Sequence, residues 1–185
     1  MTLNGLPIPR TVLLSENKPD SISSVKLPFG FPMIFKRQYS SQGLGVELIT
    51  GPAILAELTS KCFDQNETFL LQEFIAEAKG SDLRLMVMDG ELVAAMRRSA
   101  KDGEFRANMH LGAKASAISA SEELEALAVK ATSTVGLRMA GVDIIQSKRG
   151  PLLLEINACP GFEALEAISG FNVAGKLLDL LTTQK

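Results

Sequence analysis

Two short apolar runs near the carboxyl end of the chain constrain its fold more than any other feature. Residues 142–146 and 152–156 are rich in Val, Ile and Leu, and the polar, Gly-containing segment 147–150 separates them. Strand-forming runs joined by such a turn predict an antiparallel β-hairpin. The fold must therefore contain strands that pair with their neighbours in the sequence.

The predicted hairpin brings three polar side chains together. If its turn centres near Arg149, Asp143 lies opposite Glu155, and the two-residue period of a strand places Asn157 on the same face as Glu155. Two carboxylates and an amide oxygen suit a hard cation such as Mg²⁺, which also contacts substrate phosphates. A solvated polar hairpin face explains the same pattern without a metal.

The rest of the chain alternates short strands with helices. Asp89-Gly90 is the strongest two-residue hairpin signal. Ser121 precedes three acidic residues and an apolar stripe, which predicts a capped amphipathic helix. The further expected strands are 31–37, 46–50, 68–75, 83–88 and 92–98, and the expected helices are 52–63, 121–135 and 173–181. Hairpins separated by helices predict an α+β fold.

Composition narrows the class of protein. A chain of 185 residues with 46% hydrophobic content can bury a core as one domain or two small lobes. A net charge of −2 argues against a broad nucleic-acid-binding surface. The two cysteines form no C-x-x-C pair, and the chain has no long apolar run or secretory leader. We therefore expect a cytoplasmic protein without membrane or direct nucleic-acid partners.

A second group of residues predicts contact with phosphate. Lys36 lies near the end of the expected strand 31–37, which is followed by the small, polar segment 38–45 that contains Gly43 and Gly45. Glycines allow a close approach of the backbone, and successive N–H groups can hold anionic oxygens. The segment is not a GxxxxGK[ST] loop. An ordinary hairpin turn and a surface lysine are the alternatives.

Three polar residues lie in or after an otherwise apolar expected strand. Gln72 and Glu73 must either lie at an exposed sheet edge or be used, because a buried unpaired charge is costly. Asp82 follows a Gly-Ser turn, where its carboxylate can accept hydrogen bonds from a ribose or stabilise the turn.

The densest positive segment follows the Asp89-Gly90 turn and contains Arg97, Arg98 and Arg106. Positive groups aimed at a phosphoryl group or an oxyanion stabilise developing charge. A solvated charged face is the alternative. No nucleophile pattern surrounds His110, so we expect it to be structural or solvent-exposed, and Cys159 has no identified base, so we expect a small packing residue rather than a nucleophile.

Together these residues resemble the ATP-grasp ligases, and within them the RimK-type glutamate ligases. The resemblance covers almost the whole chain through VKLPFGFPMIFKRQYSSQGLGV, LLQEFIAEAKGSDLRLMV, MRRSAKDGEFRANMHLGAKA, AGVDIIQSKRGPLLLEINACPGFEALE and GFNVAGKLL. It implies an α+β fold whose two lobes hold ATP, approximately residues 1–72 and 73–185. Family members carry a further N-terminal domain ahead of this region, and the resemblance implies that it is absent here.

The resemblance also assigns roles to single positions. It implies catalytic roles for Arg98 and Arg106, with Arg97 as a competing neighbour for the first of these roles. It implies that the metal ligands are Asp143, Glu155 and Asn157. The positions implied to bind nucleotide are Lys36, Ser41, Gln42, Gly43, Glu73, Phe74, Asp82, Arg106, Ala107 and Asn108.

The implied activity is an ATP-dependent carboxylate–amine ligase. An acceptor carboxylate becomes an acyl phosphate, and the amine of L-glutamate or a similar amino acid then displaces phosphate. The implied cofactors are ATP and Mg²⁺, with Mn²⁺ as a substitute, and the implied acceptor is a peptide, a protein C-terminus or a metabolite. A homo-oligomer is expected.

Two other functions fit the same residues. The alternative is a MgATP-binding module without ligase turnover, because the N-terminal domain is missing. A scaffold without nucleotide function is the third hypothesis. Amino-acid-dependent ADP release distinguishes the first hypothesis from the second, and Mg²⁺-dependent ATP binding distinguishes both from the third.

Overall fold

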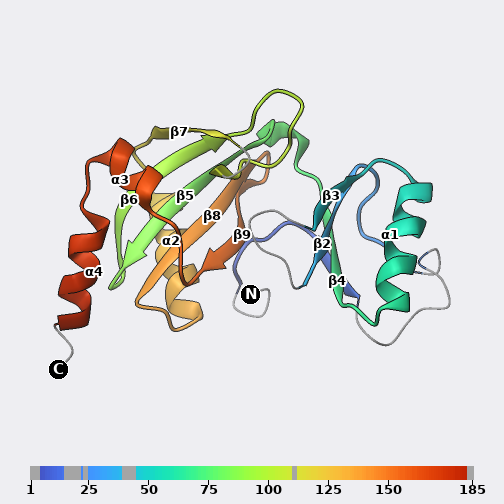
Figure 1. The fold of residues 1–185 in the computed structure, drawn as a ribbon, viewed down its shortest axis with the longest axis horizontal. Helices are drawn as coiled ribbons and strands as arrows, with labels where there is room; N and C mark the ends of the chain where they lie inside the picture. The colour runs from blue at the N-terminus through green and yellow to red at the C-terminus, as the bar shows by residue number, and fades with distance from the viewer. Residues whose placement is uncertain (1–4, 15–21, 23–24, 39–44, 110–111, 183–185) are drawn as a thin grey trace. The chain divides into compact units, whose positions relative to one another are not determined.

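The computed structural model describes residues 5–14, 22, 25–38, 45–109 and 112–182. The chain divides into two compact units, one formed by Pro9–Ala76 and the other by Met1–Ile8 with Glu77–Lys185 (Figure 1). Each unit is built on its own antiparallel sheet, and each is described by itself.

The smaller unit is a four-stranded sheet covered by one helix. Its strands are β1 (Thr11–Leu14), β2 (Met33–Arg37), β3 (Val46–Ile49) and β4 (Phe69–Glu73), in the order β1-β4-β2-β3. Helix α1 (Pro52–Asp64) begins with Pro at its first turn, where the missing N–H costs no hydrogen bond. It buries Leu55, Leu58 and Cys62 against the sheet.

Alternation of side chains along the strands forms this first core. Met33 and Phe35 lie two residues apart on β2 and therefore point to the same face, where both are buried. Phe69 on β4 stacks on Phe35 with ring centroids 5.2 Å apart. The short strand β1 was not predicted, because a four-residue run carries almost no periodicity and forms only by pairing with β4.

The larger unit is a five-stranded antiparallel sheet with the order β7-β6-β5-β8-β9. Its strands are β5 (Ser81–Met88), β6 (Glu91–Ser99), β7 (Lys114–Ala117), β8 (Met139–Ser147) and β9 (Gly150–Asn157). The two predicted hairpins, β5–β6 and β8–β9, are both present. They join through the pairing of β5 with β8, which places residues distant in the sequence side by side.

Helix α2 (Glu122–Thr134) covers one face of this sheet. Ser121 caps it by accepting a hydrogen bond from the Leu124 N–H at 3.4 Å. Leu124, Leu127 and Ala128 pack against the sheet residues that alternate on this face. The capped helix is therefore confirmed, and its acidic first turn suits the helix dipole.

Helices α3 (Glu163–Ser169) and α4 (Val173–Thr182) lie on the opposite side of the sheet from α2 (Figure 1). They bury a methionine-rich patch that includes Met86, Met88 and Met96. Methionine is flexible enough to fill an irregular space between two short helices and a twisted sheet. The seven-residue α3, the 3-10 turn η3 (Ala76–Ala78) and β7 were not predicted.

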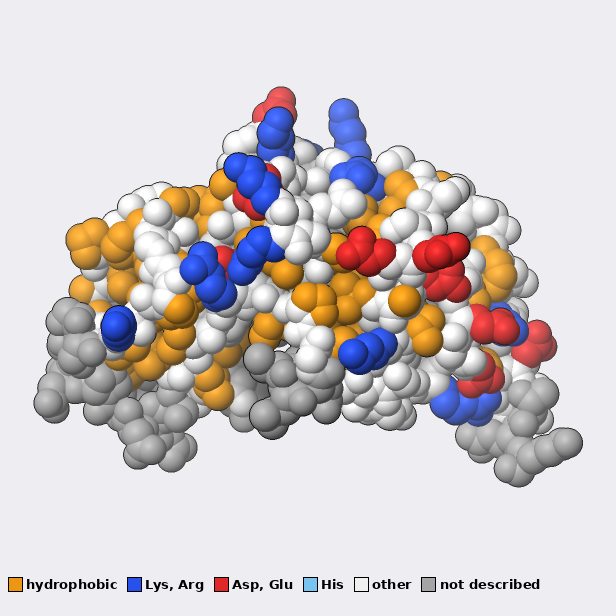
Figure 2. Space-filling view, turned by 180° about the vertical axis from the view of Figure 1, so that it is seen from behind, with side chains coloured by type: hydrophobic (Ala, Val, Ile, Leu, Met, Phe, Trp, Pro, Cys, Tyr) orange, Lys and Arg blue, Asp and Glu red, His pale blue; other side chains and the backbone are white. Residues whose placement is uncertain are grey.

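The outer surface of the molecule is mixed in character. Figure 2 shows that the face seen from behind carries Lys or Arg and Asp or Glu side chains, with uncharged and apolar surface between them. Among the described residues, no helix is long and apolar enough to cross a membrane.

Candidate functional site

The helices α3 and α4 cover only part of their sheet face, and the rest of that face is polar. The alternation of side chains puts Asp82 and Arg84 of β5 on the same face as Met86, while Arg98 of β6 pairs with Asp82 in the ladder. Asp143 of β8 pairs with Arg84. Three adjacent strands thus gather two acids and two arginines beyond the methionine patch.

A β-bulge in the β8–β9 hairpin adds Glu155 to this face. The turn pairs Ser147 with Gly150, and the ladder then shifts between Asp143 and Ile144, so that Asp143 pairs with Glu155. One residue of β9, Leu154, is the extra residue of the bulge. Without it, Asp143 would face Leu154. The predicted pairing of Asp143 with Glu155 is confirmed, and Asn157 follows on the same face, opposite Gly141.

Asp143 is the centre of a buried ion network. Its Oδ1 accepts a hydrogen bond from Arg84 Nε at 2.7 Å, and its Oδ2 accepts from Nη2 of both Arg84 and Arg98, each at 2.7 Å. Burial by itself raises the pKa of this carboxyl, but the two guanidinium groups outweigh burial and hold the pKa below its usual value. Asp143 therefore remains an anion in the folded protein.

Arg98 joins Asp143 to Asp82. Its Nε and Nη2 donate to the two oxygens of Asp82 at 2.7 Å each, and the arginine is only 3% exposed. Burial raises the pKa of Asp82, partly offset by Arg98. Burial lowers the pKa of Arg98, but Asp143 and Asp82 more than compensate and raise it. Both oxygens of Asp82, the position implied to contact ribose, are thus engaged with Arg98.

The structure also separates the two neighbouring arginines. Arg98 points into the network, whereas Arg97 lies on the opposite face of the sheet and donates from Nη2 to Gln146 Oε1 at 3.3 Å. Of these two neighbours, only Arg98 shares a face with Asp143, which favours Arg98 over Arg97 as the candidate phosphoryl-contacting residue.

The donor set of Asp143, Glu155 and Asn157 has the chemistry that Mg²⁺ prefers, since all three supply oxygen. Glu155 is 59% exposed in its side chain, and its Oε1 lies 3.7 Å from Arg84 Nη2. Asn157 Oδ1 accepts a hydrogen bond from the Cys159 N–H at 3.2 Å. Within the described ranges, no three His, Cys, Asp or Glu residues lie close enough together to hold a metal ion, so a site at this face would need the Asn157 amide as a third ligand.

In the smaller unit, Lys36 and Glu73 lie on adjacent strands. Lys36 is half-buried near the end of β2 and pairs with Val46. Glu73 is 7% exposed at the end of β4, and its carboxylate accepts from Arg10 N at 2.8 Å and Arg10 Nε at 2.7 Å. Strand β4 lies between β1 and β2, so exposure of Gln72 and Glu73 at a sheet edge, one of the two alternatives, is wrong.

The segment before β7 is organised by one acid. Glu104 accepts hydrogen bonds from Arg106 Nη2 at 2.8 Å and from the Phe105 and Arg106 N–H groups. These bonds, with the Arg106 side chain first, lower the pKa of Glu104 to about 2. Ala107 is buried and Asn108 is half-buried. The predicted positions Ser41, Gln42 and Gly43, and also His110, lie outside the described residues.

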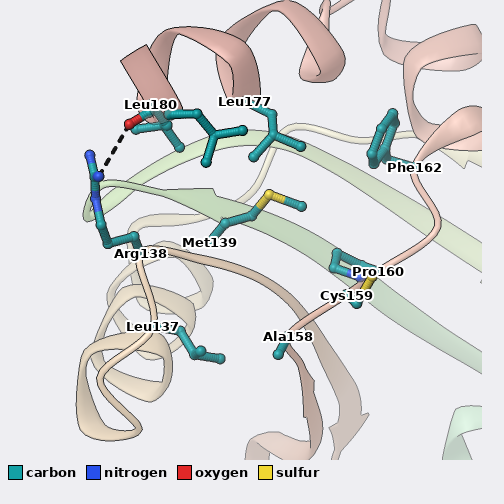
Figure 3. A pocket seen from close by; sticks show the side chains of 10 residues that line it. Leu137, Arg138, Met139, Ala158, Cys159, Pro160, Phe162, Leu177 and Leu180 are labelled. Carbon is teal, nitrogen blue, oxygen red and sulfur yellow. Dashed lines mark hydrogen bonds between the residues drawn. The ribbon is translucent and has the colours of Figure 1, made fainter. Parts of the chain in front are cut away.

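A pocket of about 380 Å³ lies between α4, the start of β8 and the segment after β9 (Figure 3). Its lining is mostly apolar and includes Met139, Phe162 and Leu177. Arg138 lines it too, but donates to the Leu180 carbonyl at 3.2 Å and forms an ion pair with Asp89. Among the described residues that line the pocket, Arg138 is the only charged one, so the candidate site is the charged face instead.

Arg84 is the one member of the charged face that sequence analysis missed. A signal for it was present, because a strand period of two places it on the same face as Asp82. Its importance depends on the pairing of β5 with β8, which no local pattern predicts.

A comparison with protein families matches residues 2–181 to the RimK-like ATP-grasp domain. The chain therefore belongs to the RimK-like ATP-grasp family, as the resemblance indicated, and the α+β fold class is confirmed. It is 44% identical to a probable alpha-L-glutamate ligase of Aeromonas salmonicida over 177 residues. The matched region covers 96% of this chain and 58% of that protein. The chain thus spans little more than half the length of that relative.

Solved structures show the same fold. The ATP-grasp ligase PsnB, complexed with a phosphomimetic variant of its minimal precursor, Mg and ADP, has a TM-score of 0.72 and 26% identity, over 98% of this chain and 54% of PsnB. A D-alanine–D-alanine ligase from Bacillus anthracis has a TM-score of 0.73 over 98% of this chain and 62% of its own, at 18% identity.

Proposed function

We propose that this chain is the ATP-binding and phosphoryl-transfer part of a carboxylate–amine ligase that adds L-glutamate or a similar amino acid to a peptide or metabolite carboxylate. The observation that carries the proposal is the convergence of Asp143, Glu155 and Asn157 with Arg84 and Arg98 on one sheet face of a RimK-like ATP-grasp domain. The relatives named alpha-L-glutamate ligases support glutamate as the donor.

The proposed reaction forms one amide bond per ATP. A carboxylate oxygen of the acceptor attacks the γ-phosphorus of ATP, and ADP leaves. The amine of the donor then attacks the acyl carbon, loses a proton, and displaces inorganic phosphate. Neither step needs a covalent nucleophile from the protein, because positioning and charge stabilisation supply most of the acceleration.

The residues of the proposed site divide into metal ligands, phosphate contacts and nucleotide contacts. Asp143, Glu155 and Asn157 would hold Mg²⁺, which when bound would neutralise charge on the phosphates. Arg98 and Arg106 stabilise the transferring phosphoryl group. Lys36, with segment 41–43, contacts the phosphates as a point charge and a glycine-containing loop. Glu73 and Phe74 meet the adenine, Asp82 lies near the ribose, and Ala107 and Asn108 contact the nucleotide.

The test is ADP release by the purified chain with MgATP, L-amino acids and peptides that end in an acidic residue. We expect a signal that depends on both amino acid and acceptor and that is abolished in Glu155→Ala. The matched control is Glu125→Ala, which removes an exposed acid from α2 on the other side of the sheet. Near-normal ADP formation by Glu155→Ala at saturating Mg²⁺ would reject the proposed metal site.

A second function is favoured by the length of the chain. The chain matches 58% of its Aeromonas relative, and the acceptor site of such a ligase could lie in the part of that relative that the chain does not match. The chain would then bind MgATP without turnover. Tight Mg²⁺-dependent nucleotide binding without amino-acid-dependent ADP release would establish this alternative.

A further inference from the structure

Arg84 occupies the position between the two carboxylates of the proposed metal set. Its Nε and Nη2 bind Oδ1 and Oδ2 of Asp143 at 2.7 Å each, and the same Nη2 lies 3.7 Å from Glu155 Oε1. The arginine side chain is only 12% exposed. One guanidinium group therefore interacts with both acids.

The hydrogen bonds of Asp143 limit what it can offer to any other cation. A carboxylate oxygen has two lone-pair positions. In the described part of the chain, Oδ2 accepts from Arg84 and Arg98, which uses both of its positions, while Oδ1 accepts from Arg84 alone. One lone pair on Oδ1 is left as long as both arginines stay in place.

The balance of charges at this face also limits its attraction for a cation. Asp82, Asp143, Arg84 and Arg98 sum to zero, so Glu155 contributes the only net negative charge of the five residues. Without Arg84, the partly exposed Glu155 and the buried Asp143 would face each other as two like charges across the hairpin. Such a pair attracts a cation strongly.

We propose that Arg84 is a built-in competitor of the metal ion. It acts as a positioning residue that holds Asp143 opposite Glu155 and weakens cation binding until nucleotide phosphates add their own charge to the site. The inference rests on the proposed function, because it takes Asp143 and Glu155 as cation ligands. It assigns to Arg84 a role that is separate from contact with substrate.

The test is Mn²⁺ binding to the nucleotide-free chain, followed by electron paramagnetic resonance of free Mn²⁺. We expect Arg84→Gln to bind Mn²⁺ about tenfold more tightly than the unchanged chain, because a nearby positive charge is removed. The same variant should lose ATP turnover, since Asp143 loses its two-point support. A merely structural role would weaken both properties together.

Arg97→Gln is the matched control. It removes the same charge one residue away from Arg98, but on the opposite face of the sheet. Its Mn²⁺ affinity should stay within about twofold of the unchanged chain, because the half-buried Arg97 lies on the other face of the sheet and makes no ion pair with Asp143 or Glu155 in the described part of the chain. An equal increase in both variants would show a general charge effect and overturn the proposal.

Arg84→Lys keeps the test valid if Arg84→Gln does not fold. Lysine retains the positive charge but cannot bind both Asp143 oxygens in the same way, so its Mn²⁺ affinity should remain close to the original. A tenfold gain in Arg84→Lys would contradict charge competition.

Asp143→Asn separates this inference from the proposed function. If Asp143→Asn abolishes Mn²⁺ binding but Arg84→Gln does not tighten it, only the competitor role is overturned. Unchanged Mn²⁺ binding in Asp143→Asn would reject the metal site itself, and the inference with it.

Discussion

At the scale of single residues, the arginine–aspartate network places four charged side chains in contact at low solvent exposure on one sheet face of the larger unit. Its two acids and Arg98 are each less than 10% exposed. Buried ion pairs contribute little net stability when intact, because desolvation offsets their attraction. Breaking one is costly, because it leaves a buried charge without its partner. The network therefore constrains the site more than it stabilises the fold.

Replacing Arg98 should show that breaking this buried ion pair is costly, although the intact pair adds little net stability. Arg98→Met leaves Asp82 buried without its bidentate partner, and we expect the free energy of unfolding to fall by about 3 kcal/mol. Urea denaturation followed by circular dichroism measures it. Arg97→Met, on the other face, should cost less than about 1 kcal/mol. A loss of equal size in both variants would argue that the network has no special role.

Glu104 predicts a pH dependence. Its pKa falls from 4.5 to about 2 on folding, so its contribution to stability is complete above pH 4.5 and is lost as the pH falls toward 2. Glu104→Gln should therefore flatten the decrease in unfolding free energy over this range. Denaturation at pH 6, 4 and 2 measures the difference between the two proteins. An identical acid dependence would contradict the lowered pKa.

At the scale of elements, a bulge and one close backbone contact shape the hairpin that carries the site. The bulge in β9 sets which side chain faces Asp143. On the same hairpin, a Cβ at Gly141 would lie 2.7 Å from Pro160 Cβ, so only glycine lets the segment after β9 approach β8 this closely. Packing of α3 on the sheet depends on Leu165, which is fully buried.

Gly141→Ala should disturb the site through Pro160. The added methyl group pushes on a rigid ring three residues after Asn157, so we expect a loss of about 1–3 kcal/mol and weaker Mn²⁺ binding. Denaturation and metal titration test the two effects. Gly30→Ala is the control, because nothing lies within 4 Å of its Cβ position. Unchanged Mn²⁺ affinity in Gly141→Ala would show that the contact between Gly141 and Pro160 does not position the proposed metal ligands.

Leu165→Ala should destabilise the α3 region. Removing a fully buried leucine costs about 2–5 kcal/mol, and the neighbouring methionines favour the lower end because they can move into the space. The control is Leu178→Ala on α4, where the side chain is 63% exposed and the expected loss is below about 1 kcal/mol. Thermal unfolding of both variants gives the comparison. Equal losses would show that α3 packs loosely.

At the scale of the whole molecule, two units with separate cores carry different parts of the predicted site. The positions implied to bind phosphate and adenine lie in the smaller unit, at Lys36 and Glu73. The ion network and the proposed metal ligands lie in the larger unit. A ligand that binds only the native state stabilises that state against unfolding.

Removal of metal should test this linkage. Binding to the native state at a hundred times the dissociation constant adds about 2.7 kcal/mol of stability. We expect MgATP to raise the melting temperature of the chain, EDTA to abolish the increase, and Glu155→Ala to show much less of it. Differential scanning calorimetry measures all three. An increase that survives EDTA would argue for nucleotide binding without the proposed metal ligands.

Local signals were sufficient for the parts of the fold that depend on neighbours in the sequence. The Asp89-Gly90 turn, the Ser121 cap and the alternation around Asp143 act over a few residues, so hairpins β5–β6 and β8–β9 and helix α2 could be predicted. The facing of Asp143 and Glu155 was predicted from a turn centred near Arg149, but in the structure it depends on the bulge at Leu154, which no local pattern indicated.

Only the tertiary structure decided the rest. The short elements β1, β7 and α3 exist because a sheet edge or face is available to pair with or cover, and their own sequences show too little periodicity to indicate them. The pairing of β5 with β8 is what brings Arg84 to Asp143 across 59 residues. The sequence by itself thus determined which residues carry charge and which way they face within a strand. Long-range packing determined which of them meet, because burial of an apolar face sets the order of strands.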